Sequence, residues 1–258
     1  MPDWTRFEGN PDFVLSLGRG LAVIEAFEDR TDGVTVADIA ARTGFSRAAA
    51  RRLVMTLELL GYASHSGPVY RLGSRVLRLG FSFLSSHSLP ALALPILEEI
   101  SSTIHESSSL SVLEGDEIVY LARSATRRVL SVGLSVGSRL PAYCTSMGRV
   151  LLAALPDREL ASYLKKMILR AHTPHTITGK RTLQAELKRT RDRGYALVSE
   201  ELELGLRSLA VPVIARSGQV VAAMNTGVQS SRVTAGEMIE KFLPVLQEGA
   251  ATLGRAVG

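Results

Sequence analysis

Two short helices in immediate succession are the feature that most constrains the fold of this chain. Thr35 is the predicted N-cap of the first helix, and Asp38 completes an acidic version of the capping box. Gly44 ends that helix in the position that favours a left-handed residue. Ser46 is the predicted N-cap of the second helix, which Gly61 closes. Two capped helices separated by so few residues predict a helix-turn-helix.

A preceding helix and a following hairpin complete a winged form of this motif. Apolar residues recur at helical spacing over residues 13–27, with Asp12 as the expected cap. Residues 62–64 and 69–72 have the pattern of two short strands joined by a Ser-Gly-Pro turn. A helix, a helix-turn-helix and a hairpin in this order predict a winged helix-turn-helix domain over residues 13–73.

The distribution of charge indicates what this domain binds. The 258-residue chain has 30 Lys and Arg against 25 Asp and Glu, a net charge of +5. Residues 46–80 contain six arginines and one acid, so this window alone carries +5. Residues 1–45 have four basic and eight acidic residues, and residues 81–258 have 20 and 16, so the remainder of the chain is balanced. A basic window of this kind predicts a surface that binds a polyanion.

Three arginines share one side of the second helix. Arg47 and Arg51 lie about one turn apart and Arg52 lies beside them, with small alanines between. The width of a helix fits the major groove of B-DNA, which is about 12 Å wide. A solvated basic helix is the plainer alternative, but the capped helix-turn-helix around the arginines favours double-stranded operator DNA as the partner. The expected contacts to bases and phosphates are Ser46, Arg47, Arg51, Arg52 and, on the wing, Arg71 with His65 beside it.

After a serine-rich stretch the pattern changes to mixed helices and strands. Residues 1–12 are an expected lead-in, residues 74–88 an expected linker helix, and residues 89–258 a second domain. Strands joined by turns, with helices on a face, predict an α+β sheet domain of sensor type. The expected strands are 109–113, 117–122, 129–134, 195–199, 208–214 and 220–227, and the expected helices are 92–105, 146–155, 158–167, 183–193 and 235–257.

Composition excludes several other classes of protein. The single cysteine, Cys144, excludes an intramolecular disulfide and a Cys-rich metal site. No apolar run approaches the roughly 20 residues of a membrane span, and the N-terminus lacks a secretory leader. The sequence therefore predicts a soluble, cytoplasmic protein without a membrane partner.

Three groups of residues resemble catalytic or metal sites only superficially. Cys144 would need a positioned base and a lowered pKa to act as a nucleophile. His172 and His175 have metal-like spacing, but a proline stands between them and no further ligand pattern follows. The acids Glu200, Glu201 and Glu203 precede a glycine and fit an exposed turn or helix end. We expect no catalytic residue, no metal site and no cofactor.

Several stretches of both domains form recognisable motifs. In the first domain these are Ser-Leu-Gly-Arg-Gly-Leu at 16–21, Phe-Ser-Arg-Ala-Ala-Ala-Arg-Arg at 45–52 and Leu-Gly-Tyr at 60–62, and in the second they are residues 140–149 and 194–213. These motifs resemble the IclR family (the isocitrate lyase regulator family) of bacterial transcription factors, and the resemblance covers nearly the whole chain from residue 13. Tyr-Cys-Thr-Ser-Met-Gly-Arg at 143–149 and Glu-Leu-Glu-Leu-Gly-Leu-Arg-Ser at 201–208 are most similar to the subgroup that regulates protocatechuate, 4-hydroxybenzoate and β-ketoadipate catabolism.

The resemblance implies a GAF-like effector domain, a homodimer or dimer of dimers, and control by a small carboxylated metabolite. RNA polymerase would be a further partner of an activator. In glyoxylate-responsive relatives an acid stands at the position of Val198, and Met147 is larger than their alanine, so a more apolar ligand is expected. The helix starting near Ser146 would offer N–H groups to a carboxylate. The effector-binding residues implied by the family are Tyr143, Ser146, Met147, Val198, Ser208, Asn225 and Gly227.

The sequence thus predicts a regulator whose operator binding is controlled by a small aromatic or ring-cleavage carboxylic acid. Ligand binding in the second domain would change the disposition of two helix-turn-helix units. Three alternatives remain: an IclR-family regulator of another carbon-source pathway, an enzyme using the C-terminal cavity, and a basic adaptor that binds protein. Activation and repression, and a dimer and a tetramer, are equally compatible with the sequence.

Overall fold

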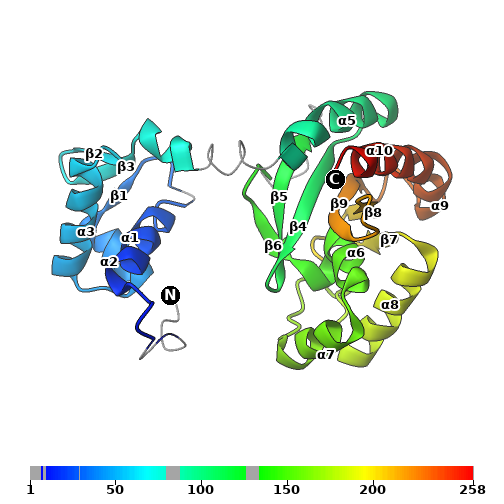
Figure 1. The fold of residues 1–258 in the computed structure, drawn as a ribbon, viewed down its shortest axis with the longest axis horizontal. Coiled ribbons are helices and arrows are strands. Elements are labelled where there is room, and N and C mark those ends of the chain that lie inside the picture. The colour runs from blue at the N-terminus through cyan, green and yellow to red at the C-terminus, as the bar shows by residue number, and fades with distance from the viewer. Residues whose placement is uncertain (1–6, 8–9, 29, 80–87, 126–133, 258) are drawn as a thin grey trace. The chain divides into compact units, whose positions relative to one another are not determined.

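The chain forms two compact units, Met1–Ser86 and His87–Gly258, in a computed structural model that describes residues 7, 10–28, 30–79, 88–125 and 134–257 (Figure 1). The expected lead-in and linker helix lie largely outside the described residues, as does the strand expected over 129–134. Residues 74–79 are helical, beginning with the turn Ser74–Val76. Among the helices of the described ranges, none is long and apolar enough to cross a membrane.

The first unit packs three helices against a small antiparallel sheet (Figure 1). Val23, Ile39 and Val54 are fully buried where the helices meet. The strands have the order β1-β3-β2, and β1, which the sequence does not predict, ties the start of α2 to the wing hairpin. The elements are α1 (Leu15–Glu25), β1 (Val34–Thr35), α2 (Val36–Thr43), α3 (Arg47–Leu59), β2 (Ala63–Ser66) and β3 (Val69–Leu72).

The caps predicted for α2 and α3 are confirmed. The Thr35 side chain accepts from the N–H of Asp38, whose carboxylate accepts from the N–H of Thr35 at 2.8 Å. Gly44 has a φ of 76°, a left-handed conformation that glycine adopts without steric cost. The Ser46 hydroxyl accepts from the N–H of Ala49 at 3.2 Å. These contacts fix both ends of α2 and the start of α3.

The first helix starts later than the sequence predicts. Val14 occupies the N-cap position of α1 and makes no side-chain cap. Asp12 does not occupy the cap position, because it lies in a turn that precedes α1, where its N–H donates to the Asn10 side chain at 2.9 Å.

The second unit is built on a six-stranded antiparallel sheet with the order β6-β5-β4-β9-β8-β7. The short edge strand β6 is not predicted by the sequence. The strands are β4 (Ser108–Glu114), β5 (Glu117–Ser124), β6 (Arg139–Pro141), β7 (Ala196–Ser199), β8 (Leu206–Ile214) and β9 (Val220–Gln229). Together with the first unit, this sheet domain confirms the predicted α+β architecture.

Helices cover both faces of this sheet, rather than the single face that the sequence suggested (Figure 1). The helices α5 (Ser88–Ile104) and α10 (Leu243–Ala256) cover one face, and a short α9 (Ala235–Glu237) and a π-helical turn lead into α10. The helices α6 (Ser146–Ala154), α7 (Asp157–Lys166) and α8 (Lys180–Arg193) lie on the other side.

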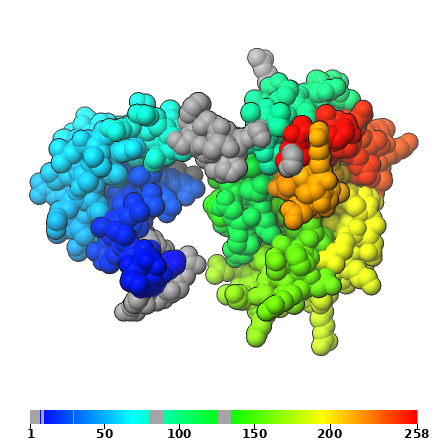
Figure 2. Space-filling model, in the orientation of Figure 1, coloured from blue at the N-terminus to red at the C-terminus, as the bar shows by residue number. Residues whose placement is uncertain are grey.

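Each face of the sheet has its own apolar core. Leu97 of α5 and Leu246 of α10 are fully buried against one face, and Leu152 of α6 is fully buried against the other. A side chain at Gly249 would place its Cβ 2.6 Å from Ile100, so glycine at this position lets α10 approach α5 closely. In Figure 2 the red atoms of α10 lie against the blue-green atoms of α5. The second face, with α6, carries the cavity described next.

Candidate functional sites

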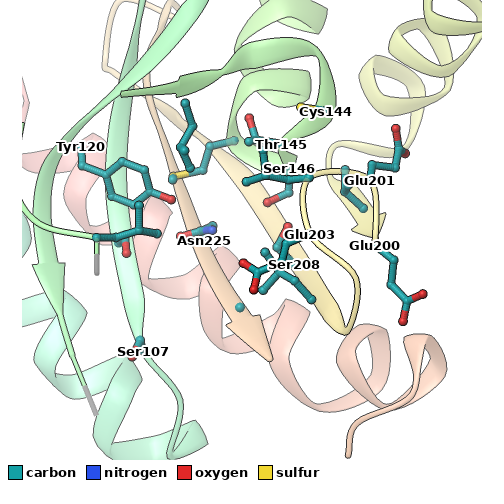
Figure 3. A pocket seen from close by; sticks show the side chains of 18 of the residues that line it. Ser107, Tyr120, Cys144, Thr145, Ser146, Glu200, Glu201, Glu203, Ser208 and Asn225 are labelled. Atoms are coloured by element: carbon teal, nitrogen blue, oxygen red, sulfur yellow. The ribbon is translucent and has the colours of Figure 1, made fainter. Parts of the chain in front are cut away.

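A cavity lies between the second sheet, the start of α6 and the loop after β7 (Figure 3). Strand pairing arranges its floor in rows, because paired residues project from the same face of a sheet. Ser109 of β4 pairs with Arg123 of β5 on one side and with Asn225 of β9 on the other. In the next row Ser208 of β8 pairs with Gly227. Residues from distant parts of the chain therefore meet in one polar floor.

The cavity collects six of the seven residues that the family resemblance implies. These are Ser146, Met147, Val198, Ser208, Asn225 and Gly227. The seventh, Tyr143, does not line it, in contrast to the expectation: its hydroxyl donates to the backbone oxygen of Arg170 at 2.7 Å. Tyr143 lies in the turn Ala142–Cys144, which directs its side chain away from the cavity while Cys144 lines it.

The start of α6 forms one wall of the cavity (Figure 3). Thr145 is the N-cap and accepts from the N–H of Gly148 at 3.3 Å. Ser146 is 1% exposed, and its hydroxyl has no hydrogen-bond partner within the described part of the chain. The first N–H groups of a helix also lack partners inside the helix and carry a partial positive charge. An oxygen of a bound molecule would satisfy both the hydroxyl and these N–H groups.

A buried ion pair fixes the opposite wall to α6. An Arg149 amino group donates to Glu201 Oε2 at 2.6 Å, and the two side chains are only 2% and 9% exposed. The N–H of Ile177 donates to the same carboxylate oxygen at 3.0 Å. The expectation that Glu201 lies on the surface is wrong, because its arginine partner stands 52 residues earlier and no local pattern reveals it.

Glu200 is held in a strained conformation beside this ion pair. It has a φ of 60°, in the left-handed region that residues with side chains rarely adopt. The Ser230 hydroxyl donates to its carboxylate, and His175 Nε2 lies 3.6 Å from it. The hydrogen bond from Ser230, with a smaller contribution from His175, lowers the pKa of Glu200 below its usual value. This carboxylate is therefore ionised near neutral pH.

The residues that resembled catalytic or metal sites have structural surroundings. Burial, together with the charge of Glu201, raises the pKa of Cys144 to about 12, so its thiol is protonated and a poor nucleophile. The ring of His172 lies 6.0 Å from that of Tyr143, whereas His175 approaches Glu200. In the described ranges, no group of three or more His, Cys, Asp or Glu side chains could hold a metal ion.

The expected DNA-binding residues lie together on the first unit. Arg47, Arg51 and Arg52 are exposed on α3, whose opposite side buries Ala50, Val54 and Leu57. Within the part of the chain that the structure describes, the three guanidinium groups make no ion pair. Ser46 and Arg71 are also exposed. The surface is thus basic and its charges are available to a ligand.

Two neighbours of this surface have roles that the sequence did not predict. His65 Nδ1 lies 2.5 Å from Glu58 Oε1, so the one acid of the basic window is hydrogen-bonded to the wing. Arg75 donates to the backbone oxygen of Leu60 at 2.6 Å and stacks 5.1 Å from the centre of the Tyr62 ring. It thereby satisfies a carbonyl at the end of α3.

Models of two known domain families match the chain. The IclR helix-turn-helix domain matches residues 16–67. The C-terminal domain of the bacterial transcriptional regulator IclR matches residues 81–255. The two matches fall on the unit with α3 and on the unit with the cavity.

Individual proteins are similar over nearly the full length. The Pca regulon regulatory protein of Pseudomonas putida is 50% identical over 93% of this chain and 83% of its own. The p-hydroxybenzoate hydroxylase transcriptional activator of Acinetobacter baylyi is 39% identical over 95% of this chain and 93% of its own. A solved structure of an IclR homologue from Microbacterium hydrocarbonoxydans, complexed with 4-hydroxybenzoate, is 27% identical with a TM-score of 0.82, covering 93% of this chain and 97% of its own.

Proposed function

Because this chain belongs to the IclR family of bacterial transcriptional regulators, we propose that it binds operator DNA and that a small carboxylic acid controls this binding. The similar proteins are named as regulators of the Pca regulon and of p-hydroxybenzoate hydroxylase. The regulated genes are accordingly those of aromatic-acid catabolism, and the effector is an aromatic or ring-cleavage acid.

The unpaired hydroxyl of Ser146 is the observation that carries the effector proposal. A buried hydroxyl without a partner costs free energy, and an oxygen of a bound acid would remove that cost. Met147 and Val198 provide apolar walls on which a ring or carbon chain packs. Ser208, Asn225 and Gly227 form the floor beneath it.

The free arginines of α3 support the DNA proposal. Arg47, Arg51 and Arg52 would enter the major groove, with Ser46 and the wing residue Arg71 on the phosphates. An operator with two half-sites requires two copies of α3, so the acting species is at least a homodimer. The acid would change the disposition of the two copies, and couplings of this kind are typically about 1–3 kcal/mol.

A thermal-shift screen of the full chain tests the effector. We expect protocatechuate, 4-hydroxybenzoate or β-ketoadipate to raise the melting temperature, because a ligand that binds only the native state stabilises it by about 2.7 kcal/mol at 100 times its Kd. Ser146→Ala should reduce the shift, and Ser162→Ala, at an exposed position on α7, should not. The acid that raises the melting temperature should also change the retardation, in a gel, of the DNA adjoining the protein's own gene.

Different failures of this screen have different meanings. No shift with any acid would contradict the aromatic-acid effector. A shift without any change in DNA retardation would contradict the coupling between the two units. No retardation at all at low salt would contradict operator binding, because phosphate contacts are strongest there.

A further inference from the structure

The cavity has a second polar end, at the sheet. Arg123 on β5 is the one cationic side chain among the described residues that line it. The side chain is half-buried, and no carboxylate of the described residues pairs with it. One of its amino groups donates to Ser109 Oγ at 3.1 Å, which occupies one of the five N–H donors of a guanidinium. A partly desolvated charge without a counterion favours binding of an anion.

Two further donors surround this guanidinium. The Tyr120 hydroxyl points into the cavity (Figure 3). Burial raises the pKa of Tyr120 to about 12, while the charge of Arg123 acts in the opposite direction, which places the two groups close together. The phenol is therefore protonated and able to donate. Asn225 adds an amide, since it pairs with Ser109 in the same row of the sheet.

The end of the cavity at α6 is less favourable to an anion. A helix N-terminus carries only about half an elementary charge, less than a guanidinium. The loop after β7 also places carboxylates on this side: burial first, and then the charge of Glu201, raises the pKa of Cys144, two residues before α6, and Glu200 is ionised. An ionised ligand group gains more at Arg123, where two parallel hydrogen bonds to a carboxylate can form.

We infer that Arg123, together with Tyr120, anchors the effector's carboxylate, and that the α6 end with Ser146 receives a second oxygen of the same molecule. The inference rests on the proposed function, namely that the cavity binds a small acid. It defines the ligand class as an acid with a carboxylate at one end of an apolar body and a second oxygen at the other. It also replaces the sequence expectation that the N–H groups of α6 hold the carboxylate.

Isothermal titration of the full chain with matched ligands tests this orientation. The first pair is 4-hydroxybenzoate and 4-hydroxybenzamide, which differ in the ionised group; the second is β-ketoadipate and its monoamides. In the wild type the acid should bind roughly 10- to 100-fold more tightly than the amide. Arg123→Met should weaken binding of the acid by a similar factor and should change binding of the amide little. Ser146→Ala should weaken binding of the acid and of the amide by the same factor.

The outcomes separate this inference from the proposed function. Equal losses for acid and amide in Arg123→Met would overturn it, as would a loss restricted to the acid in Ser146→Ala. Arg123→Lys should recover part of the acid affinity, because the charge is retained without the planar guanidinium. Failure of the wild type to bind any acid would contradict the proposed function and the inference together. Unchanged melting temperatures of the ligand-free variants exclude misfolding as the cause.

Discussion

At the residue scale, the walls of the cavity are joined by the buried ion pair between Arg149 and Glu201. Arg149 belongs to α6 and Glu201 to the loop after β7, so their contact joins two walls that are distant in the sequence. Arg149 also donates through Nε to the backbone oxygen of Tyr143 at 3.1 Å. Such a pair is not strongly stabilising compared with apolar packing, but removing one partner leaves the other charge buried and unpaired.

Glu201→Gln should therefore lower the stability of the second unit by about 3–5 kcal/mol, because the Arg149 charge remains buried. Urea unfolding of the full chain, followed by circular dichroism, measures the change. Glu117→Gln provides the matched control, since it breaks an ion pair with Arg139 in which both side chains are about 40% exposed. The loss of unfolding free energy in this variant should stay below about 1 kcal/mol. Equal losses in the two variants would show that burial of the pair is not what matters.

At the scale of elements, the best-predicted parts are those whose signals are local. Thr35, Gly44 and Ser46 mark the ends of α2 and α3 through contacts within four residues, so the sequence contains the whole signal. The strands β1 and β6 have two and three residues and exist only through pairing with distant strands. No local sequence pattern therefore predicts these two strands.

The lining of the cavity likewise combines residues that local motifs indicate with residues that only long-range strand pairing brings there. Family motifs indicate the positions near Ser146 and Val198, whereas no motif indicates Arg123. It comes to the cavity through the register that pairs β5 with β4 and β4 with β9, and that register is a property of the assembled sheet. Tyr143 departs from the expectation for a related reason, because the rotation of the turn Ala142–Cys144 decides which side chain faces the cavity.

The arginines of α3 should differ in what their loss does to DNA binding. Arg47→Ala, Arg51→Ala and Arg52→Ala should each weaken operator binding, with the larger losses at the latter two. A bidentate guanine contact should cost about 1–3 kcal/mol and reduce discrimination between sequences, whereas a phosphate contact should weaken all sequences alike. Gel retardation with the operator and with a scrambled duplex separates the two. Arg181→Ala on α8 provides the control, because it removes an exposed arginine from the second unit and should change neither affinity nor discrimination. Unaltered affinity in all three α3 variants would refute the placement of the DNA-binding surface on α3.

At the scale of the whole molecule, the two units have separate hydrophobic cores. Ile39 is fully buried in the first unit and Leu97 in the second, and none of the described residues belongs to the cores of both units. The protein therefore consists of two bodies that each fold around their own interior.

Scanning calorimetry should resolve these two bodies as two transitions. Ile39→Ala should lower one and Leu97→Ala the other, each by roughly 2–5 kcal/mol in unfolding free energy, because a buried aliphatic side chain is removed. The effector should raise the transition that Leu97→Ala lowers. A single transition displaced by both substitutions would mean that the units unfold cooperatively, contrary to this expectation.

Separate cores also affect how such a protein can diverge. A substitution in the lining of the cavity alters packing against one face of the second sheet and leaves the interior beneath α3 untouched. Selection for a new effector can thus proceed without loss of operator binding, and selection for a new operator can proceed without loss of effector binding. Lineages that acquire a different carbon source need to change only one of the two units at a time.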